Sequence, residues 1–231
     1  MSRRYAIYYA PPPGSQLEAF GRSWIGRDHL SGEPVPRPAV PGFTADELDT
    51  VTAFPRLYGF HATLKAPFEL AAGCSVDELH QAAAAFAAAR RPFACPRLQV
   101  SGLSAFIALT LSEPSSAMQV LADDSVRAFE PCRAPLTDAE LARRRASGLT
   151  PRQDEYLVRF GYPYVFEQFH FHMTLTGPLD PHEHARLLGL LTELAEPVTR
   201  APVAVDAIAV YEQPDRTTPF TLTARYRFAG S

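Results

Sequence analysis

A repeated eight-residue pattern constrains this 231-residue chain more than any other feature. HATLKAPF begins at His61 and HMTLTGPL begins at His172, so both copies read H-x-T-L-x-(A/G)-P-(F/L). Each copy is followed by a capped helix and two further strands, which gives two units, at about 58–111 and 169–228. A unit that occurs only twice predicts two halves related by approximate twofold symmetry, because a solenoid needs shorter and more numerous repeats.

Periodicity and end signals place the other elements. Strands are expected at Arg4–Ala10, Tyr58–Ala66, Phe169–Thr176, Val203–Glu212 and Thr218–Phe228, with two more between Leu98 and Leu111. Helices are expected at Leu17–Ile25, from Ser75 (with Glu78 as a capping box), at Ala117–Phe129 and at Asp180–Ala195. The proline-rich stretch 32–42 suits neither element and is expected on the surface.

This order of elements predicts an α+β fold in one bilobal domain over residues 1–231. We expect two antiparallel sheets related by a pseudo-twofold axis, with helices on their outer faces and a polar cleft between them. Residues of about 132–168 have no counterpart in the first unit and form an insert. Its densest basic run, Arg143 to Arg145, is expected on a solvated helix, although an insert can also fold over a cleft and select substrates.

Alternation within both motif strands separates a polar face from an apolar one. The apolar positions are Phe60, Ala62 and Leu64 in the first copy and Phe169, Phe171, Met173 and Leu175 in the second. The positions between them are His61, Thr63 and Lys65, and His170, His172, Thr174 and Thr176. A strand has a period of two, so each copy presents a His and a Thr together on one face.

Two imidazoles and two hydroxyls in opposition suit phosphodiester cleavage. One neutral His can take a proton from the attacking group while the other, protonated, gives one to the leaving oxygen. Thr63 and Thr174 can donate hydrogen bonds to the phosphoryl oxygens. We therefore predict His61, Thr63, His172 and Thr174 as catalytic residues. Substrate binding is predicted for Lys65, Tyr58, Tyr164 and His170, and Arg4 and Arg56 are possible further phosphate ligands.

The same segments resemble a known family. The paired H-x-T-L strands, the N-terminal RYAIYYAPP and the late IAVYEQ are similar to the 2H phosphoesterase superfamily. LYGFHATLKAPF and FGYPYVFEQFHFHMTLTGPL further resemble a bacterial subfamily associated with phosphonate-degradation gene clusters. The resemblance implies a bilobal α+β fold, an active site formed by both motifs without metal or other cofactor, and a cyclic phosphodiester substrate. For the phosphonate subfamily it suggests a cyclic phosphorylated ribose.

Other interpretations of the motifs stay open. A single His is more often structural than catalytic, and the repetition of the motif is what favours catalysis. His170 with His172 also looks like a strand metal pair, but the repeat supplies Thr where a third ligand is needed. Asp180 to His184 is explained by a helix cap with Pro at the first position. The chain has no G-x-S-x-G and no Gly-rich phosphate loop.

Composition limits the possible partners. The chain has 22 basic and 25 acidic residues, and the resulting net charge of −3 gives no reason to expect a membrane or a long nucleic acid as partner. No apolar run is long enough to span a membrane. Its three cysteines, Cys74, Cys95 and Cys132, form no CxxC pair and are expected as reduced thiols, so we expect a cytoplasmic protein. All basic residues except Lys65 are Arg, which makes any single Arg weak evidence of function.

We therefore predict an enzyme, a phosphoric diester hydrolase acting on a small-molecule phosphate ester. Two alternatives remain. One is a non-catalytic module that binds a nucleotide or sugar phosphate in the same cleft. The other is an RNA-end 2',3'-cyclic phosphodiesterase, for which the acidic net charge makes a long RNA footprint unfavourable.

Overall fold

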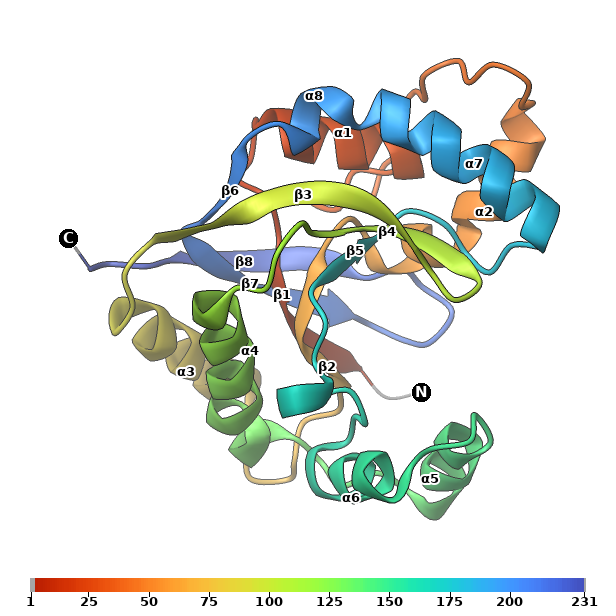
Figure 1. Ribbon diagram of the computed structural model, residues 1–231. Coiled ribbons are helices and arrows are strands. Elements are labelled where there is room, and N and C mark those ends of the chain that lie inside the picture. Colours follow the sequence, from red (N-terminus) through yellow and green to blue (C-terminus); the bar gives the residue numbers. More distant parts are fainter. Residues whose placement is uncertain (1–2, 231) are drawn as a thin grey trace.

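The computed structural model describes residues 3–230 (Figure 1). The strands are β1 Arg4–Tyr9, β2 Ala62–Phe68, β3 Phe93–Leu103, β4 Phe106–Leu111, β5 His172–Thr174, β6 Pro202–Val205, β7 Ala207–Gln213 and β8 Thr221–Arg227. The α-helices are α1 Gln16–Ile25, α2 Ala45–Tyr58, α3 Val76–Ala88, α4 Ser116–Ala128, α5 Asp138–Arg145, α6 Pro151–Phe160, α7 Pro181–Leu194 and α8 Glu196–Thr199. Two 3-10 turns, η1 Glu130–Cys132 and η2 Phe166–Gln168, flank the insert.

The strands of residues 3–230 form one eight-stranded sheet in the order β6-β3-β4-β5-β2-β1-β7-β8. Every neighbouring pair is antiparallel, so the predicted α+β class and antiparallel pairing are confirmed. The two expected sheets are joined into one, because the motif strands β2 and β5 pair with each other at Ala62 and Met173. The two halves therefore meet side by side within a sheet, whereas the sequence had suggested two sheets facing each other across a cleft.

The two repeat units are interleaved in this sheet. The motif strand β2 pairs with β1, and β1 pairs on its other side with β7 of the β7–β8 hairpin, which belongs to the second unit. The motif strand β5 lies beside the β4–β3 hairpin, which belongs to the first unit. Each half of the sheet thus contains the motif strand of one unit and the hairpin of the other. Neither unit alone can form a complete half of the sheet.

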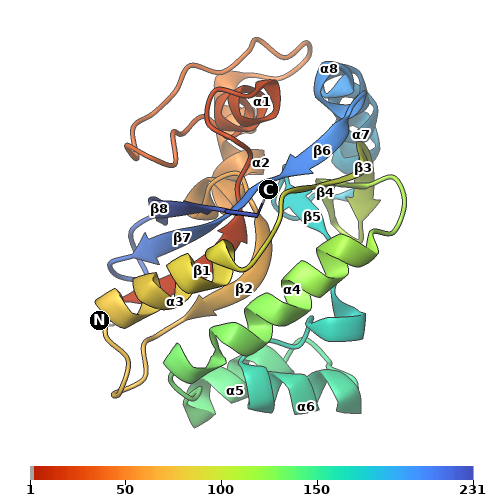
Figure 2. The ribbon, with the colours of Figure 1, turned by 90° about the vertical axis from the view of Figure 1, so that its left-hand side faces the viewer.

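Helices cover the sheet in two groups (Figures 1 and 2). Helices α1, α2, α7 and α8 lie together above the sheet in the view of Figure 1, while α3 and α4 lie below it. Helix α7 packs on β3 and β4, and α3 packs on β7 and β8. The insert helices α5 and α6 lie below the sheet, at the far end from α7 and α8 in both views.

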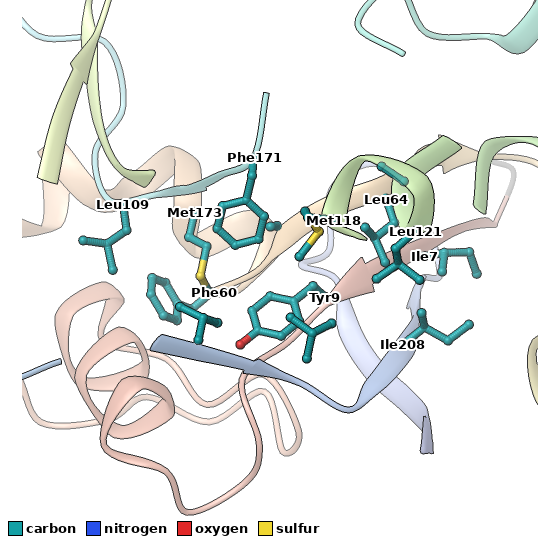
Figure 3. Close-up of a cluster of buried hydrophobic side chains, with 14 of the residues drawn as sticks. Ile7, Tyr9, Phe60, Leu64, Leu109, Met118, Leu121, Phe171, Met173 and Ile208 are labelled. Carbon is teal, nitrogen blue, oxygen red and sulfur yellow. The ribbon is translucent and has the colours of Figure 1, made fainter. Parts of the chain in front are cut away.

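The apolar face of the motif strands forms part of the main core (Figure 3). Leu64 of β2 and Met173 of β5 are buried, as the alternation predicts, and they gather with Ile7, Phe60 and Leu109. A buried Met or Leu cut back to Ala costs about 2–5 kcal/mol. This packing fixes which face of each strand is presented to the site, because a slip of one residue would bury the histidines instead.

Several elements differ from the sequence expectation: helices α6 and α8 were not predicted, β2 begins at Ala62, and the expected strand Val203–Glu212 is divided into β6 and β7. Helix α2 was not predicted, although Thr44 and Glu47 form a capping box at its start. Strand β5 has three residues, where Phe169–Thr176 was expected. It ends at Thr174 because the backbone N–H groups of Leu175 (2.9 Å) and Thr176 (3.2 Å) both donate to the carbonyl of Ile107, which breaks the regular ladder with β4. The predicted capping box of Ser75 and Glu78 is confirmed at the start of α3.

The prediction of reduced thiols was wrong for two of the three cysteines. Cys74 and Cys132 form a disulfide, and Cys95 is a buried free cysteine. The loop after β2 runs beside η1, where the N–H of Ala71 donates to the carbonyl of Cys132 (2.9 Å), and this brings the two sulfurs together. Sequence separation concealed the contact. Within residues 3–230, no helix combines the length and the hydrophobicity that a membrane span requires.

Candidate active site

The two His-x-Thr motifs meet in one cleft of about 540 Å³. His61, Thr63, His172 and Thr174 all line it. Strands β2 and β5 run antiparallel with Ala62 opposite Met173, so on the cleft face His61 stands across from Thr174, and Thr63 across from His172. Opposed residues on one face of a sheet lie within reach of a single small group, such as a phosphoryl group.

Both imidazoles are held in the same way. Nδ1 of His61 lies 2.9 Å from the carbonyl oxygen of Gly59, and Nδ1 of His172 lies 2.8 Å from that of His170. A carbonyl only accepts, so each Nδ1 carries the proton and each Nε2 is left with its lone pair. In each half the holding carbonyl lies two residues before the histidine.

The two histidines differ in what covers them. The ring of Tyr8 stacks on His61 with centroids 3.6 Å apart and planes 20° apart. Tyr8 pairs with Thr63 across β1 and β2, and the residue that pairs with Thr174 at the matching position is Ala108. Alanine has no ring, so His172 has no equivalent stack, and Phe106 approaches it only at 6.0 Å with a tilted ring.

Burial decides the protonation of both rings in the free protein. It lowers the pKa of His61 from 6.5 to about 3, an effect that the Gly59 carbonyl opposes and His172 reinforces. Burial also lowers the pKa of His172, again against the effect of the carbonyl that holds it. Both imidazoles are therefore neutral at pH 7 until an anion enters the cleft. Nε2 of His61 lies 3.3 Å from Oγ1 of Thr63, which can donate to it.

The predicted role of Lys65 in substrate binding is wrong. The register between β1 and β2 shifts between Ile7 and Tyr8, and this irregularity ends the simple alternation after Leu64. Lys65 is 2% exposed and does not line the cleft. Its ammonium group is paired with Glu130 and donates to the carbonyl of Val126 (3.2 Å).

The other predicted binding residues have mixed positions. Tyr58, the last residue of α2, lines the cleft and lies 6.3 Å from His61, ring to ring. Tyr164 is 45% exposed and lines an adjoining apolar cavity of about 490 Å³, which shares Thr63, Tyr162 and His172 with the cleft. His170 lines that cavity too and does not line the cleft, although its carbonyl oxygen contacts Nδ1 of His172.

Four arginines also contribute to the cleft. Arg4, Arg143, Arg144 and Arg216 line it. Arg56 does not, since it pairs with Asp49 (2.5 Å) along α2. Arg143 is exposed, as expected for a solvated helix, and Arg144 is partly buried; both line the cleft, which agrees with the alternative that the insert folds over it. Sequence reasoning missed Arg216, which carries no local signal, and Tyr8, which the alternation of the first strand could have indicated.

The described residues hold no group of three or more His, Cys, Asp or Glu side chains arranged to bind a metal ion. His170 and His172 therefore have no third ligand near them within residues 3–230.

A sequence model of one protein family matches residues 63–221, more than half of the chain. Its description is "Protein of unknown function (DUF1045)". The chain belongs to this DUF1045 family. The matched segment includes Thr63 and the whole second motif.

Two curated proteins are similar to this DUF1045 chain over nearly all of its length. One, from Janthinobacterium sp. (strain Marseille), is 40% identical over 232 residues, which cover 98% of the chain and 51% of that protein. The other, from Laribacter hongkongensis (strain HLHK9), is 35% identical over 219 residues, covering 95% of the chain and 50% of that protein. Both are named "Ribose 1,5-bisphosphate phosphokinase PhnN". The chain spans about half the length of these relatives.

Solved structures similar to the chain include E. coli LigT with 3'-AMP, at 15% identity, a TM-score of 0.44 and full coverage of both chains. A structure titled "Crystal structure of phosphoesterase" matches at 16% identity and a TM-score of 0.42, also with full coverage. The protein ATU0111 from Agrobacterium tumefaciens str. C58 matches at 14% identity and a TM-score of 0.44, covering 97% of this chain and 86% of that one.

Proposed function

We propose that this chain is a phosphodiesterase that hydrolyses a small cyclic phosphodiester by acid-base catalysis with two histidines. The observation that supports this most directly is the opposition of the two His-x-Thr pairs in one cleft, with each Nδ1 held by a carbonyl and each Nε2 left available. Proton transfer at the two ends of an in-line displacement needs this arrangement.

The proposed reaction starts when the anionic phosphodiester enters the cleft and raises the pKa of the imidazoles, so that one of them takes up a proton. The neutral imidazole then removes a proton from water as the water oxygen bonds to phosphorus. The bond from phosphorus to one ester oxygen breaks, and the protonated imidazole gives its proton to that oxygen. The product is a phosphomonoester with a free hydroxyl group, and Thr63 and Thr174 donate to the phosphoryl oxygens throughout.

The surroundings of the histidines favour one assignment of roles. His61 is covered by Tyr8 and has its pKa lowered to about 3, so it stays neutral and suits the base. His172 lacks the stack and suits the acid, because an imidazole under less cover is charged at lower cost. Groups whose environments differ in this way commonly divide the acid and base roles.

For the substrate we propose a cyclic phosphate of a phosphorylated ribose. The sequence resemblance to the phosphonate-associated subfamily supports this, and so does the name of the two relatives, which refers to a ribose that carries two phosphates. We do not extend the kinase activity in that name to this chain. The chain has no Gly-rich phosphate loop, and its single lysine is buried against Glu130.

The test is phosphomonoester formation, followed by ³¹P NMR, from ribosyl 1,2-cyclic phosphate, its 5-phosphate and nucleoside 2',3'-cyclic phosphates. His61→Ala and His172→Ala should each lower turnover by about 10² or more. The matched control is His182→Ala, an exposed position in the first turn of α7, which should keep full activity. Activity should also survive excess chelator.

Full activity in both active-site variants would refute the mechanism. Tight binding in calorimetry with no turnover of any compound would favour the non-catalytic binding module. Preference for the nucleoside 2',3'-cyclic phosphates would favour the RNA-end enzyme.

A further inference from the structure

The charges that line the cleft are all of one sign. Among the described residues that line it, four are arginines and none is Asp or Glu. The adjoining cavity, which begins at Thr63 and His172, is lined by no Arg or Lys. The site therefore combines a cleft with cationic side chains, two of them from α5, and an adjoining apolar cavity lined by Phe106 and Tyr164.

Two of the four arginines already have carboxylate partners. Arg216 donates to Glu140 (2.5 Å) and to Glu69 (3.3 Å), and Arg143 lies 4.0 Å from Glu140. These pairs also position the insert. Glu140 caps the start of α5 through Thr137 while it binds Arg216 from the β7–β8 loop, so it ties the helix to the edge of the cleft.

The other two arginines have no such partner. Arg144 forms no ion pair with any carboxylate of residues 3–230, and Arg4 donates to the neutral amide oxygen of Gln213 (2.8 Å from Nε). Burial, reinforced by neighbouring arginines, lowers the pKa of both. Glu69 near Arg4 and Glu140 near Arg144 offset part of this charge, and an anion bound between the two half-buried guanidinium groups would offset more of it.

We propose that Arg4 and Arg144 bind a second phosphoryl group of the substrate, separate from the phosphodiester that the two His-x-Thr motifs hold. This inference rests on the proposed function for the position of the reacting phosphate. The planar fork of a guanidinium group bonds two phosphate oxygens at once, and two such forks discriminate strongly for a dianionic phosphomonoester. The insert thus selects substrates that carry a terminal phosphate, and it orients them with that phosphate toward α5.

The experiment compares two ligands that differ only in this group, ribosyl 1,2-cyclic phosphate and its 5-phosphate. Both are titrated calorimetrically into a His61→Ala/His172→Ala chain that does not turn over, with and without Arg144→Gln or Arg4→Gln. The same arginine changes are made in the wild-type chain for measurement of kcat/KM. Arg145→Gln is the matched control, since Arg145 is the next residue of α5, is exposed and does not line the cleft.

The phosphorylated compound should bind on the order of tenfold to hundredfold more tightly, the usual worth of charge-assisted hydrogen bonds. Arg144→Gln and Arg4→Gln should each remove most of this preference while they leave affinity for the unphosphorylated compound unchanged, and Arg145→Gln should keep the preference. Equal affinity for both compounds, or a preference that survives both arginine changes, overturns the inference. Absence of turnover combined with an arginine-dependent preference overturns the proposed function and leaves the phosphate subsite standing.

Discussion

Replacing His61 with asparagine tests how strongly the cleft desolvates this imidazole. Burial lowers the pKa of His61 from 6.5 to about 3. Between these two pH values this imidazole is protonated in the unfolded chain and neutral in the folded chain. The free energy of unfolding therefore falls as the pH drops below 6.5, and the loss continues until the pH reaches the folded-state pKa. The titration of His61 alone should lower the free energy of unfolding by about 2 kcal/mol at pH 5 and by close to nothing at pH 7.5.

The assay is urea unfolding followed by circular dichroism at pH 7.5 and pH 5. Between these values the wild type should lose about 2 kcal/mol more stability than His61→Asn, because asparagine does not titrate. His182→Asn, at an exposed position of α7, should lose as much as the wild type. Equal losses in the wild type and His61→Asn would mean that water reaches the ring in the folded chain, and would refute the assignment of His61 as the base that is neutral before the reaction begins.

Three further changes test other parts of the structure. Lys65→Met should cost only about 1 kcal/mol in urea unfolding, because Arg133 still pairs with Glu130 (2.7 Å), while KM stays unchanged; a several-fold rise in KM would show that Lys65 does bind substrate. Tyr8→Leu should lower kcat about tenfold through loss of the stack that positions His61, and unchanged kcat would show that the stack is incidental. Cys74→Ser with Cys132→Ser should lower stability by about 4 kcal/mol, as expected for a loop of 58 residues, and reductant should have no further effect on that variant.

The sequence predicted the fold where local chemistry and periodicity agree. Strand β1 and helix α4 were placed to within a residue or so, and the capping box at Ser75 fixed the start of α3. Helix α2 was missed because the residue after it is Gly59, just before the motif strand, and Tyr58 was assigned to that strand. The merging of two expected sheets into one depends on the pairing of Ala62 with Met173, which no local pattern can specify.

The candidate site was predictable to the extent that a strict strand alternation continued. It continued through His61 and Thr63, and both line the cleft with His172 and Thr174. It failed two residues later, because the register shift beside Ile7 turns Lys65 away from the cleft. Irregularities of this kind depend on the neighbouring strand, so the lysine that composition singled out became a structural residue.

The two motifs are nearly identical, and residues outside them make the two halves of the site different. Two identical halves would give a site that cannot tell base from acid, or one end of a substrate from the other. Tyr8 pairs with Thr63 in one half, and the equivalent residue that pairs with Thr174 in the other half is Ala108, so only His61 has an aromatic ring stacked on it. The insert has no counterpart in the first unit, so Arg144 adds its charge to the cleft without a symmetric equivalent. Both departures from symmetry act together. If Tyr8 sets which histidine is the base and Arg144 sets which way the substrate lies, exchanging Tyr8 and Ala108 should reverse the first without altering the second.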